Sequence, residues 1–564
     1  MSESNPYASC FWVKNYPAGV PAEIDVNHYS SLVAMYENSF KQFASRDAYR
    51  QMGARLSYAQ LAQGSKQFAA YLQHTLQLAP GTRIAMMLPN VLQYPLCMIG
   101  AHRAGLTVVN INPLYKAREL AYVLKDSQAT CIVILENFMH TLSKIIAQTQ
   151  LKHVLVTQLG DSFPWIKRTL VNSVVKYVKK LVPSWHLPQA IRLNHALKLG
   201  AKAPFKPVTV THEDIAFLQY TGGTTGISKG GILTHKNMVA NLLQALAWIK
   251  PFIKQDLKGG IITALPLYHI FSLTANCLVF QSVGITNILI TNPRDITDFI
   301  KTLRRESFSI MTGVNTLFNA LLHHPQFAKL DFTDFRFTLG GGMAVQKSVA
   351  EKWQAVTGVP LIEAYGLTET APAVAINPLL KDATYNGSVG MPLPSTQIKI
   401  CDEQQNIVPL GERGELCVQG PQVMQGYWQS PANTQAVLSK DGWLKTGDIA
   451  TLDRLGYLRI VDRKKDMILV SGFNVYPNEV EEVISGLPGV KEVAVIGVVS
   501  DSTGEAVKAF IVKEDPTLTE QQVLALCHEN LTAYKIPKFI EFSAELPKTN
   551  VGKVLRRALK SPAE

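Results

Sequence analysis

The order of its apolar runs limits what this chain of 564 residues can fold into. Short apolar runs, such as residues 83–88, 131–135 and 153–157, alternate with segments of amphipathic helical pattern. This alternation is typical of parallel α/β layers. Past residue 390 the runs become shorter between Pro and Gly turns. We predict an α/β fold: a large N-terminal domain of layered α/β subdomains with a small β-rich piece, then a small mobile α+β C-terminal domain.

The charged run at residues 462–466, Asp-Arg-Lys-Lys-Asp, marks the expected boundary between the two domains. Such a dense cluster of charges is a poor candidate for any core, and domain boundaries fall in exposed segments. The predicted division is residues 1–461 for the large domain, 462–466 for a hinge and 467–564 for the small domain.

Residues 259–293 contain no Asp, Glu, Lys or Arg and are long enough to cross a bilayer. Pro266, His269 and Asn276 interrupt the stretch, however. Its short apolar bursts are better explained as strands that are buried on both faces of a parallel sheet. We therefore expect core strands here, with a membrane-spanning helix as the alternative.

Composition narrows the class of protein only partly. The seven cysteines include no Cys-x-x-Cys pair, which argues against a zinc site and a disulfide framework and favours a reduced, cytoplasmic compartment. The start of the chain does not have the pattern of a secretory signal. A net charge of +12 favours anionic partners, but no run of alternating basic and aromatic residues indicates nucleic acid.

Residues 220–230, Tyr-Thr-Gly-Gly-Thr-Thr-Gly-Ile-Ser-Lys-Gly, concentrate glycines, hydroxyls and a lysine in one loop. Glycines let a backbone approach an anion closely, and hydroxyl and ammonium groups donate to it. The loop differs from a P-loop because Lys229 is followed by Gly230. We predict a polyphosphate site, against the alternative of a glycine-rich surface loop. Its candidate residues are Thr221, Gly222, Gly223, Thr224, Thr225, Gly226 and Lys229.

Five further segments follow this loop in the chain: residues 265–269, 340–342, 365–369, 446–448 with 462–466, and 547–553. With the loop, they resemble the motifs of the adenylate-forming enzymes, in the order of that superfamily and over most of the chain. Residues 441–450 and 459–479 make the chain most similar to bacterial long-chain fatty acyl-CoA synthetases.

The resemblance implies a reaction in two steps. A long-chain fatty acid attacks the α-phosphate of ATP, with Mg²⁺, to give acyl-AMP and pyrophosphate, and coenzyme A then displaces AMP to give a thioester. Such thioesters enter fatty acid β-oxidation or lipid synthesis. Two alternatives remain: a fatty acyl-AMP ligase that passes the adenylate to a carrier protein, and a non-catalytic basic module that binds lipid or nucleic acid.

By the same resemblance, Thr368 donates to the α-phosphate and Glu369 holds Mg²⁺, with Thr225 as a second ligand of the ion. Tyr365 lies against the adenine, Gly366 belongs to the same ATP site, and Gly340, Gly341 and Gly342 let the backbone pass close to the base. Asp448 and Arg463 hold the ribose. Taken alone, a Thr-Glu pair is also a common helix cap and an Asp after Gly is more often a turn residue.

Lys553 is the residue that we expect to carry the chemistry, because an ammonium between the carboxylate and the α-phosphate stabilises charge that develops in the transition state. Its surroundings also fit a solvated basic tail. Lys465 occupies the hinge position of the family, where a salt-bridging lysine is the alternative, and Ser471, Gly472 and Phe473 face coenzyme A. These roles are implied by the resemblance.

His269 and Trp248 are the candidates for contact with the fatty acid. A lone histidine in an apolar context is more often a packed core residue than a general base, so we assign His269 to positioning of the substrate. Trp248 lies in the helical stretch after His235, where related enzymes gate their chain pocket.

Residues 165–185 carry apolar side chains every three or four positions, with Trp at both ends and basic residues between. The apolar positions are Ile166, Leu170, Val174, Val178, Leu181 and Trp185, and the basic ones are Lys167, Arg168, Lys176, Lys179 and Lys180. This pattern suits an interfacial helix on anionic lipid, with a core-packed helix as the alternative. We expect a cytoplasmic protein that is peripheral at the inner face of the membrane. The sequence does not decide between a monomer and a homodimer.

Overall fold

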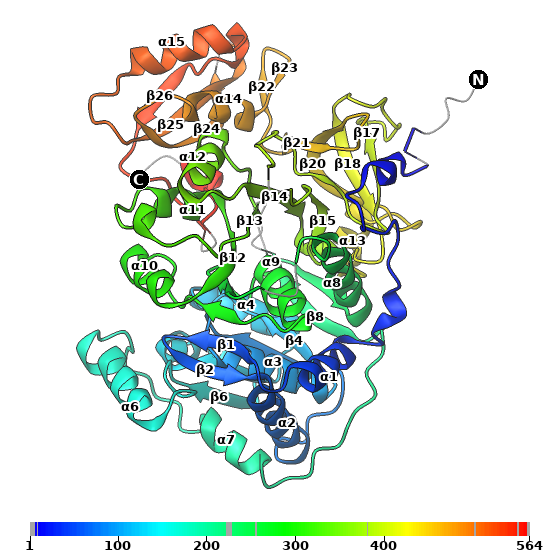
Figure 1. Ribbon diagram of the computed structural model, residues 1–564, viewed down its shortest axis with the longest axis vertical. Helices are drawn as coiled ribbons and strands as arrows, with labels where there is room; N and C mark the ends of the chain where they lie inside the picture. Colours follow the sequence, from blue (N-terminus) through cyan, green and yellow to red (C-terminus); the bar gives the residue numbers. More distant parts are fainter. Residues whose placement is uncertain are drawn as a thin grey trace.

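The computed structural model describes residues 6–7, 9–221, 228–253, 257–380, 382–500, 503–549 and 552–560. Four sheets organise this part of the chain. In Figure 1 two of these sheets build the lower and central part of the molecule, the sheet with β17, β18, β20 and β21 lies at the upper right, and the C-terminal sheet lies at the upper left. The predicted α/β class and the arrangement of a large and a small part are confirmed.

The N-terminal sheet has eight strands in the order β19-β9-β8-β4-β3-β5-β6-β7. The strands from β8 to β7 are parallel, as the alternating pattern predicts, whereas β9 and β19 join antiparallel. In that order, the strands are Gly426–Tyr427, Gly230–Thr234, Ile215–Tyr220, Thr107–Asn110, Arg83–Met87, Cys131–Leu135, His153–Thr157 and Ile191–Arg192.

The second sheet has nine strands in the order β16-β15-β14-β13-β12-β10-β11-β1-β2, with a parallel centre from β14 to β1. They are Met391–Pro392, Ala373–Ile376, Leu361–Gly366, Phe337–Gly341, Phe308–Gly313, Gly260–Thr263, Asn287–Leu289, Asp47–Gln51 and Ala54–Ser57. Strands β10 and β11 are the two buried strands predicted in the uncharged stretch, and the chain between them is helical. Among the described residues, no helix has the length and apolar character that a membrane crossing needs.

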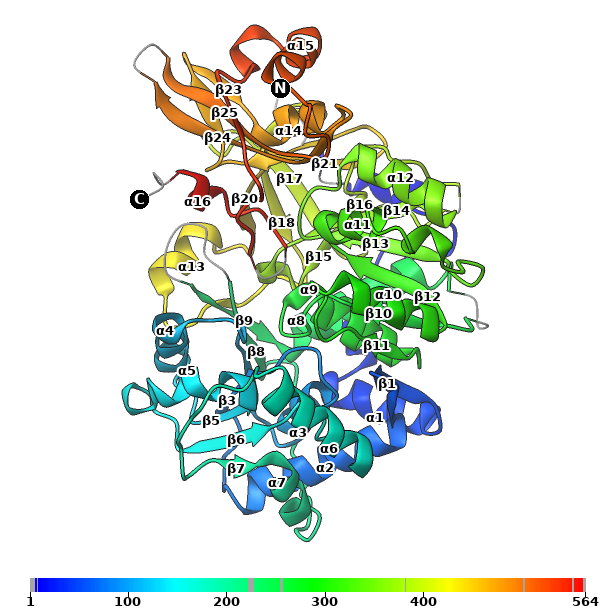
Figure 2. The same ribbon diagram turned by 90° about the vertical axis from the view of Figure 1, so that its left-hand side faces the viewer.

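Helices cover and separate these two sheets (Figures 1 and 2). Helix α8, capped by Thr234 and Asn237, contacts β8 and β9 of one sheet and β15 of the other, together with the buried π-helix Leu273–Phe280. The helices of the large part are α1 Leu32–Phe43, α2 Tyr58–His74, α3 Gln93–Arg103, α4 Ala117–Ser127, α5 Met139–Ser143, α6 Trp165–Ser173, α7 Leu193–Gly200, α8 His235–Ile249, α9 Ile270–Ser272, α10 Ile296–Arg305, α11 Asn315–Leu322, α12 Lys347–Thr357 and α13 Pro431–Val437.

The third sheet is antiparallel, in the order β17-β18-β20-β21, as the change of texture past residue 390 predicts. Its strands are Gln397–Cys401, Gly414–Gln419, Leu444–Leu452 and Leu458–Arg463. The C-terminal sheet contains β22 Ile468–Val470, β23 Phe473–Val475, β24 Val490–Ser500, β25 Gly504–Lys513 and β26 Phe539–Phe542, with helices α14 Pro477–Ser485, α15 Glu520–Asn530 and α16 Arg556–Lys560.

The charged run at 462–466 differs from the expectation in one respect. Asp462 and Arg463 belong to β21, and Asp462 is buried, with a relative exposure of 1%. Its carboxylate is compensated there, because the Asn478 backbone N–H donates to it and the Arg556 guanidinium lies 3.5 Å away. A buried charge is tolerated when it is paired and hydrogen-bonded, so the argument that this cluster would stay outside any core was wrong for Asp462.

Candidate functional site

A chain of three polar side chains joins the second sheet to the third. The hydroxyl of Tyr365, at the end of β14, donates to Asp448 on β20 at 2.5 Å, and the Arg463 Nε on β21 lies 2.8 Å from the same carboxylate. Asp448 and Arg463 are direct register partners. Burial, opposed by Arg463, raises the pKa of Asp448. Tyr365, predicted for adenine, therefore lies beside Asp448, predicted for ribose, although 83 positions separate the two in the sequence.

Lys553 reaches this cluster from the C-terminal domain. Thr549 holds its backbone, because the Lys553 N–H donates to Thr549 Oγ1 and the Thr549 N–H donates to the Lys553 carbonyl. The Thr316 hydroxyl of α11 donates to the carbonyl of Gly552 at 3.1 Å, which fastens the neighbour of Lys553 to the large domain. The end of the Lys553 side chain lies over Gly342, as its Cε is 3.6 Å from where a Cβ on that glycine would be.

The groups around Lys553 act on the pKa of its ammonium in opposite directions. Burial and the nearby Arg463 lower its pKa to about 8, whereas Asp448 and Glu369 favour its charged form. Burial and the charge of Lys553 also lower the pKa of His269 to about 3. His269 is therefore neutral near pH 7, and its Nδ1 accepts from the Phe271 N–H at the start of the next helix. This state fits the predicted positioning role better than proton transfer.

Thr368 and Glu369 lie in the 3₁₀ turn Thr368–Thr370 after β14. The Tyr427 hydroxyl donates to Glu369 Oε1 at 2.7 Å, and the ammonium of Lys229 lies 5.2 Å from the centre of the Tyr427 ring. Tyr427 thus links the predicted metal ligand to the lysine of the phosphate loop. The methyl of Thr368 lies close to Gly231, at the start of β9.

The donor set around Glu369 can be compared with the needs of Mg²⁺. That ion binds proteins through one or two carboxylates and takes its other ligands from water and substrate phosphates. Within the described residues, His, Cys, Asp and Glu form no cluster of three that could hold a metal ion alone. Glu369 therefore fits an ion that arrives with a polyphosphate.

The predicted glycines are required by close packing. A Cβ on Gly340 would lie 2.6 Å from the side chain of Leu361, and one on Gly341 would lie 2.9 Å from the Ala364 carbonyl. On Gly366 it would collide with the Pro372 carbonyl at 1.9 Å. Gly342 has a φ of +78°, which side chains disfavour. These glycines allow β13, β14 and the following turn to lie close together.

Only the ends of the phosphate loop can be placed. Thr221 and Lys229 close it, because the Thr221 N–H donates to the Lys229 carbonyl at 3.0 Å. The predictions for Gly222, Gly223, Thr224, Thr225 and Gly226 lie outside the described residues.

The predicted hinge residue Lys465 lies near this cluster, where burial and the charge of Arg463 lower its pKa while Asp466 and Asp448 oppose that change. In the described part of the chain, the neighbouring Lys464 forms an ion pair with Glu415 at 3.2 Å, whereas Lys465 forms none. Ser471 and Gly472, both with positive φ, make the turn between β22 and β23. Phe473 stacks on Tyr534 at 4.8 Å within the C-terminal domain and is 56% exposed.

Trp248 is fully buried near the end of α8. Its indole N–H donates to the Asn377 carbonyl at 3.2 Å and its ring meets Tyr16 edge-on. These contacts are those of a core residue, so a gating motion would need this packing to open.

Two residues of the site were missed by the sequence analysis. Tyr427 binds Glu369, and Arg556 lies near the hinge, 3.5 Å from Asp462 and 3.6 Å from Asp466. Tyr427 carries no local signal, because its partner is 58 positions away. Arg556 belongs to a basic cluster that was interpreted only as surroundings of Lys553.

The segment expected to form one helix over 165–185 is shorter and faces outward. Helix α6 is followed by the π-helical turn Val174–Val178, and the chain leaves the helix after that. Val171 is buried beneath the segment, whereas six large side chains are exposed. These six, Trp165, Ile166, Leu170, Tyr177, Val178 and Leu181, are exposed by 53–73% and are called the apolar ridge below. The core-packed alternative is therefore wrong for most of the apolar stripe.

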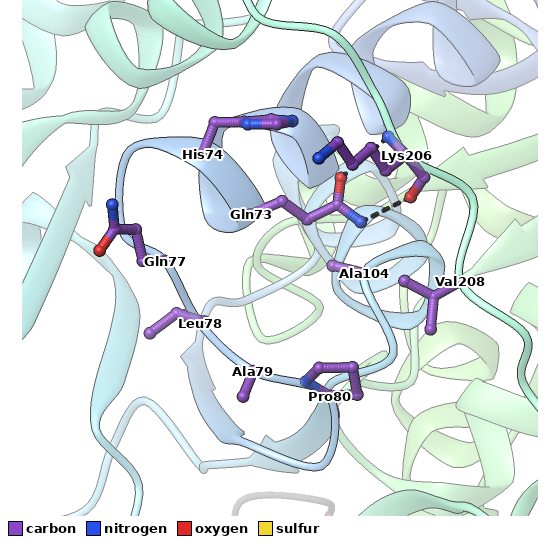
Figure 3. Close-up of a pocket in the computed structure, with 9 residues that line it drawn as sticks. All are labelled: Gln73, His74, Gln77, Leu78, Ala79, Pro80, Ala104, Lys206 and Val208. Atoms are coloured by element: carbon purple, nitrogen blue, oxygen red, sulfur yellow. Dashed lines mark hydrogen bonds between the residues drawn. The ribbon is translucent and has the colours of Figure 1, made fainter.

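A hollow of about 340 Å³ lies beside the end of α2 (Figure 3). The side-chain amide of Gln73 donates to the Lys206 carbonyl and accepts from the Lys206 N–H. These bonds fasten the loop around residue 206 to α2, and the predicted site residues do not line this hollow.

The chain was compared with families of known proteins. Residues 36–428 match the AMP-binding enzyme family, and residues 479–553 match the AMP-binding enzyme C-terminal domain. The sequence is 54% identical over 552 residues to a long-chain-fatty-acid–CoA ligase of Escherichia coli O6:H1, covering 98% of each chain. It is 35% identical over 556 residues to a ligase of the same name from Bacillus subtilis, covering 97% of each.

Solved structures share the fold over nearly the full length. The ATP-bound MatB of Rhodopseudomonas palustris superposes with a TM-score of 0.77 at 27% identity, covering 94% of this chain and 98% of that one. The anthranilate CoA ligase AuaEII, in complex with anthranoyl-AMP, gives a TM-score of 0.83 at 24% identity, with 95% and 98% covered.

Proposed function

Because this chain belongs to the AMP-binding enzyme family, we propose that it converts long-chain fatty acids to acyl-CoA through acyl-AMP, with release of pyrophosphate and AMP. The observation that carries the proposal is the convergence of Lys553, Asp448 and Glu369 from separate segments. Full-length relatives of more than 50% identity that are long-chain-fatty-acid–CoA ligases support the substrate class.

In the first step, the Lys553 ammonium stabilises the negative charge that develops between the attacking carboxylate and the α-phosphate. Such fixed charge is most effective where burial limits screening by water. Asp448 and Arg463 hold the ribose, and Tyr365 and the glycines from Gly340 to Gly342 flank the adenine. Thr368 donates to the α-phosphate, and His269, which is neutral, positions the fatty acid carboxylate. The loop at 220–230 holds the outer phosphates that leave as pyrophosphate.

Glu369, oriented by Tyr427, is the protein ligand for Mg²⁺, which would neutralise phosphate charge when bound. Thr225 is the second proposed ligand.

In the second step, the C-terminal domain turns about Lys465 and withdraws Lys553. Ser471, Gly472 and Phe473 then face coenzyme A. The freedom of Lys465 from ion pairs, within the described residues, and the exposure of Phe473 support this role.

A test of the function combines the purified protein with ATP, Mg²⁺, coenzyme A and fatty acids of increasing length. Acyl-CoA and AMP should form in equal amounts, with a preference for long chains. If acyl-AMP accumulates and free coenzyme A is not consumed, transfer to a carrier protein becomes the better assignment. If no pyrophosphate is released from ATP and fatty acid, the enzymatic proposal fails.

The proposed place of action is the inner face of the cytoplasmic membrane, where a poorly soluble fatty acid partitions. The apolar ridge supports this location, because large exposed apolar patches mark interaction sites. Lys179 and Lys180 are exposed on the same segment and would meet anionic lipid. Ile166→Ser with Leu170→Ser should reduce binding to vesicles of phosphatidylglycerol and phosphatidylcholine, whereas Leu455→Ser, at an exposed leucine elsewhere, should not. Equal binding of both variants would refute the location.

A further inference from the structure

A polar hollow of about 410 Å³ lies along one flank of the segment that carries the apolar ridge. Arg168, Asn172 and Lys176, four positions apart, line it from α6 and the π-helical turn, and Arg192 and Asp161 line it from elsewhere in the large domain. We call it the basic hollow. Three of these five side chains are cations.

The charged side chains of the basic hollow differ in whether they have ion-pair or hydrogen-bond partners within the protein. Glu136, which is buried, forms ion pairs with Lys176 at 3.6 Å and with Arg192 at 3.2 Å. Asp161 accepts from the Gln158 backbone N–H at 2.8 Å and from the Asn172 amide at 3.2 Å. The guanidinium of Arg168, by contrast, has no hydrogen bond or ion pair with any described residue.

The position of the hollow relative to the ridge indicates its ligand. Ile166 and Leu170 are exposed on the same helical turns that present Arg168 and Asn172 to the hollow. If the ridge enters the boundary between headgroups and acyl chains, the flank of the helix lies at the level of the headgroups. Arginine binds phosphate through paired N–H donors, and such charge-assisted bonds are strong.

We propose that the basic hollow binds the phosphate group of an anionic phospholipid, with Arg168 as its main donor. The proposal rests on the membrane contact proposed above. It adds a defined headgroup site to what would otherwise be attraction by diffuse charge. A free phosphate ion offers the same chemistry, but it would not make use of the adjoining ridge.

The test compares two variants of the full-length protein, Arg168→Gln and Lys179→Gln, in which a neutral amide replaces a cation. Both remove one positive charge from the same exposed segment, but Lys179 does not line the hollow. Binding to vesicles of phosphatidylglycerol in phosphatidylcholine is measured by co-sedimentation. Loss of diffuse attraction at Lys179 should weaken binding about fivefold, since one basic residue near an anionic surface contributes ~1 kcal/mol. Loss of a charge-assisted bond at Arg168 should weaken it about tenfold or more.

Three outcomes separate the proposals. If Ile166→Ser with Leu170→Ser leaves vesicle binding unchanged, the membrane contact itself fails. If that double variant loses binding but Arg168→Gln and Lys179→Gln are equal, the membrane contact stands and the headgroup site is overturned. If inorganic phosphate or glycerol 3-phosphate, at matched ionic strength, protects Arg168 from arginine modification as well as the vesicles do, the site binds free phosphate and the lipid assignment is overturned.

Discussion

The guanidinium of Arg556 lies 3.5 Å from the buried carboxylate of Asp462. Arg556 follows Lys553 by three residues, and Asp462 precedes the proposed pivot, Lys465, by three. The same guanidinium also donates to Glu481 at 2.7 Å within the C-terminal domain. This contact therefore ties the segment that bears Lys553, the proposed catalytic lysine, to the last strand of the large domain.

Arg556→Met should slow the formation of acyl-AMP about tenfold to a hundredfold, because charged hydrogen bonds contribute about 1.5–3 kcal/mol. The thioester step from supplied acyl-AMP should fall much less. Pyrophosphate release and thioester formation measure the two steps. Arg557→Met, at the adjacent exposed arginine, is the control. An equal loss in both steps would contradict a role in positioning Lys553.

Burial raises the pKa of Asp462 to about 6, while the charge of Arg556 opposes that rise. The ion pair should therefore weaken in the native protein as the pH falls through about 6, since a protonated Asp462 no longer attracts the guanidinium. We expect a decline of the adenylation rate in that range, and Asp462→Asn should remove the decline while lowering the rate at higher pH. A decline that persists in Asp462→Asn would assign it to another group.

Lys553 should set the alkaline limit of the first step. Its pKa is lowered to about 8, by burial first and by Arg463 second, so its charge is lost as the pH rises through that value. The kcat/KM for adenylation, which reports the free enzyme, should fall above about pH 8. Lys553→Arg should be slower but lack this fall, because a guanidinium stays charged. The same alkaline fall in Lys553→Arg would exclude Lys553 as its cause.

Tyr427→Phe should raise the concentration of Mg²⁺ that half-saturates adenylation. The variant removes the donor that orients Glu369 and leaves the ring beneath Lys229 in place. A hydrogen bond to a charged group of this kind corresponds to about a tenfold effect. Tyr457→Phe, at a tyrosine that does not bind Glu369, serves as the control. An unchanged Mg²⁺ requirement in Tyr427→Phe would show that Glu369 needs no such support.

Lys465→Pro should block the thioester step more than the adenylation step. Proline fixes φ near −65°, so it restricts rotation at the pivot, and the Lys465 N–H makes no hydrogen bond to a described residue that the change would remove. Lys465→Ala keeps the rotational freedom of the backbone, so this variant should still carry out both steps. Stopped reactions that start from acyl-AMP measure the second step directly. An intact second step in Lys465→Pro would place the pivot elsewhere.

Strands and close glycine contacts could be predicted because their signals are local. The run at 131–135 is apolar throughout and became a buried strand of a parallel sheet. The glycines at 340–342 indicated a close backbone approach, which the resemblance assigned to adenine, and in the structure Gly340 and Gly341 pack closely against β14. In both cases the residue type itself reports the environment.

Contacts between distant segments could not be predicted in the same way. The periodicity of residues 165–185 indicated an apolar stripe but not whether another element covers it, and the fold leaves Leu170 exposed. Asp462 was expected to lie outside the core because its charge is costly to bury. The compensating Arg556, however, lies 94 positions later in the chain, as the two residue numbers show. Burial of a charge depends on its partner, and a partner so far along the chain has no signature beside the aspartate.

The pairing of Asp448 with Arg463 has a mechanical consequence. Arg463, which we propose to hold the ribose, pairs with Asp448 and stands two residues before the proposed pivot, Lys465. Two extended residues span roughly 7 Å at most. The proposed ribose contact and the proposed pivot are therefore joined by a very short piece of backbone. A nucleotide that displaces Arg463 from Asp448 must also shift the backbone beside Lys465. The rotation of the C-terminal domain can therefore depend on whether ribose is bound, with no further residue needed to detect the nucleotide.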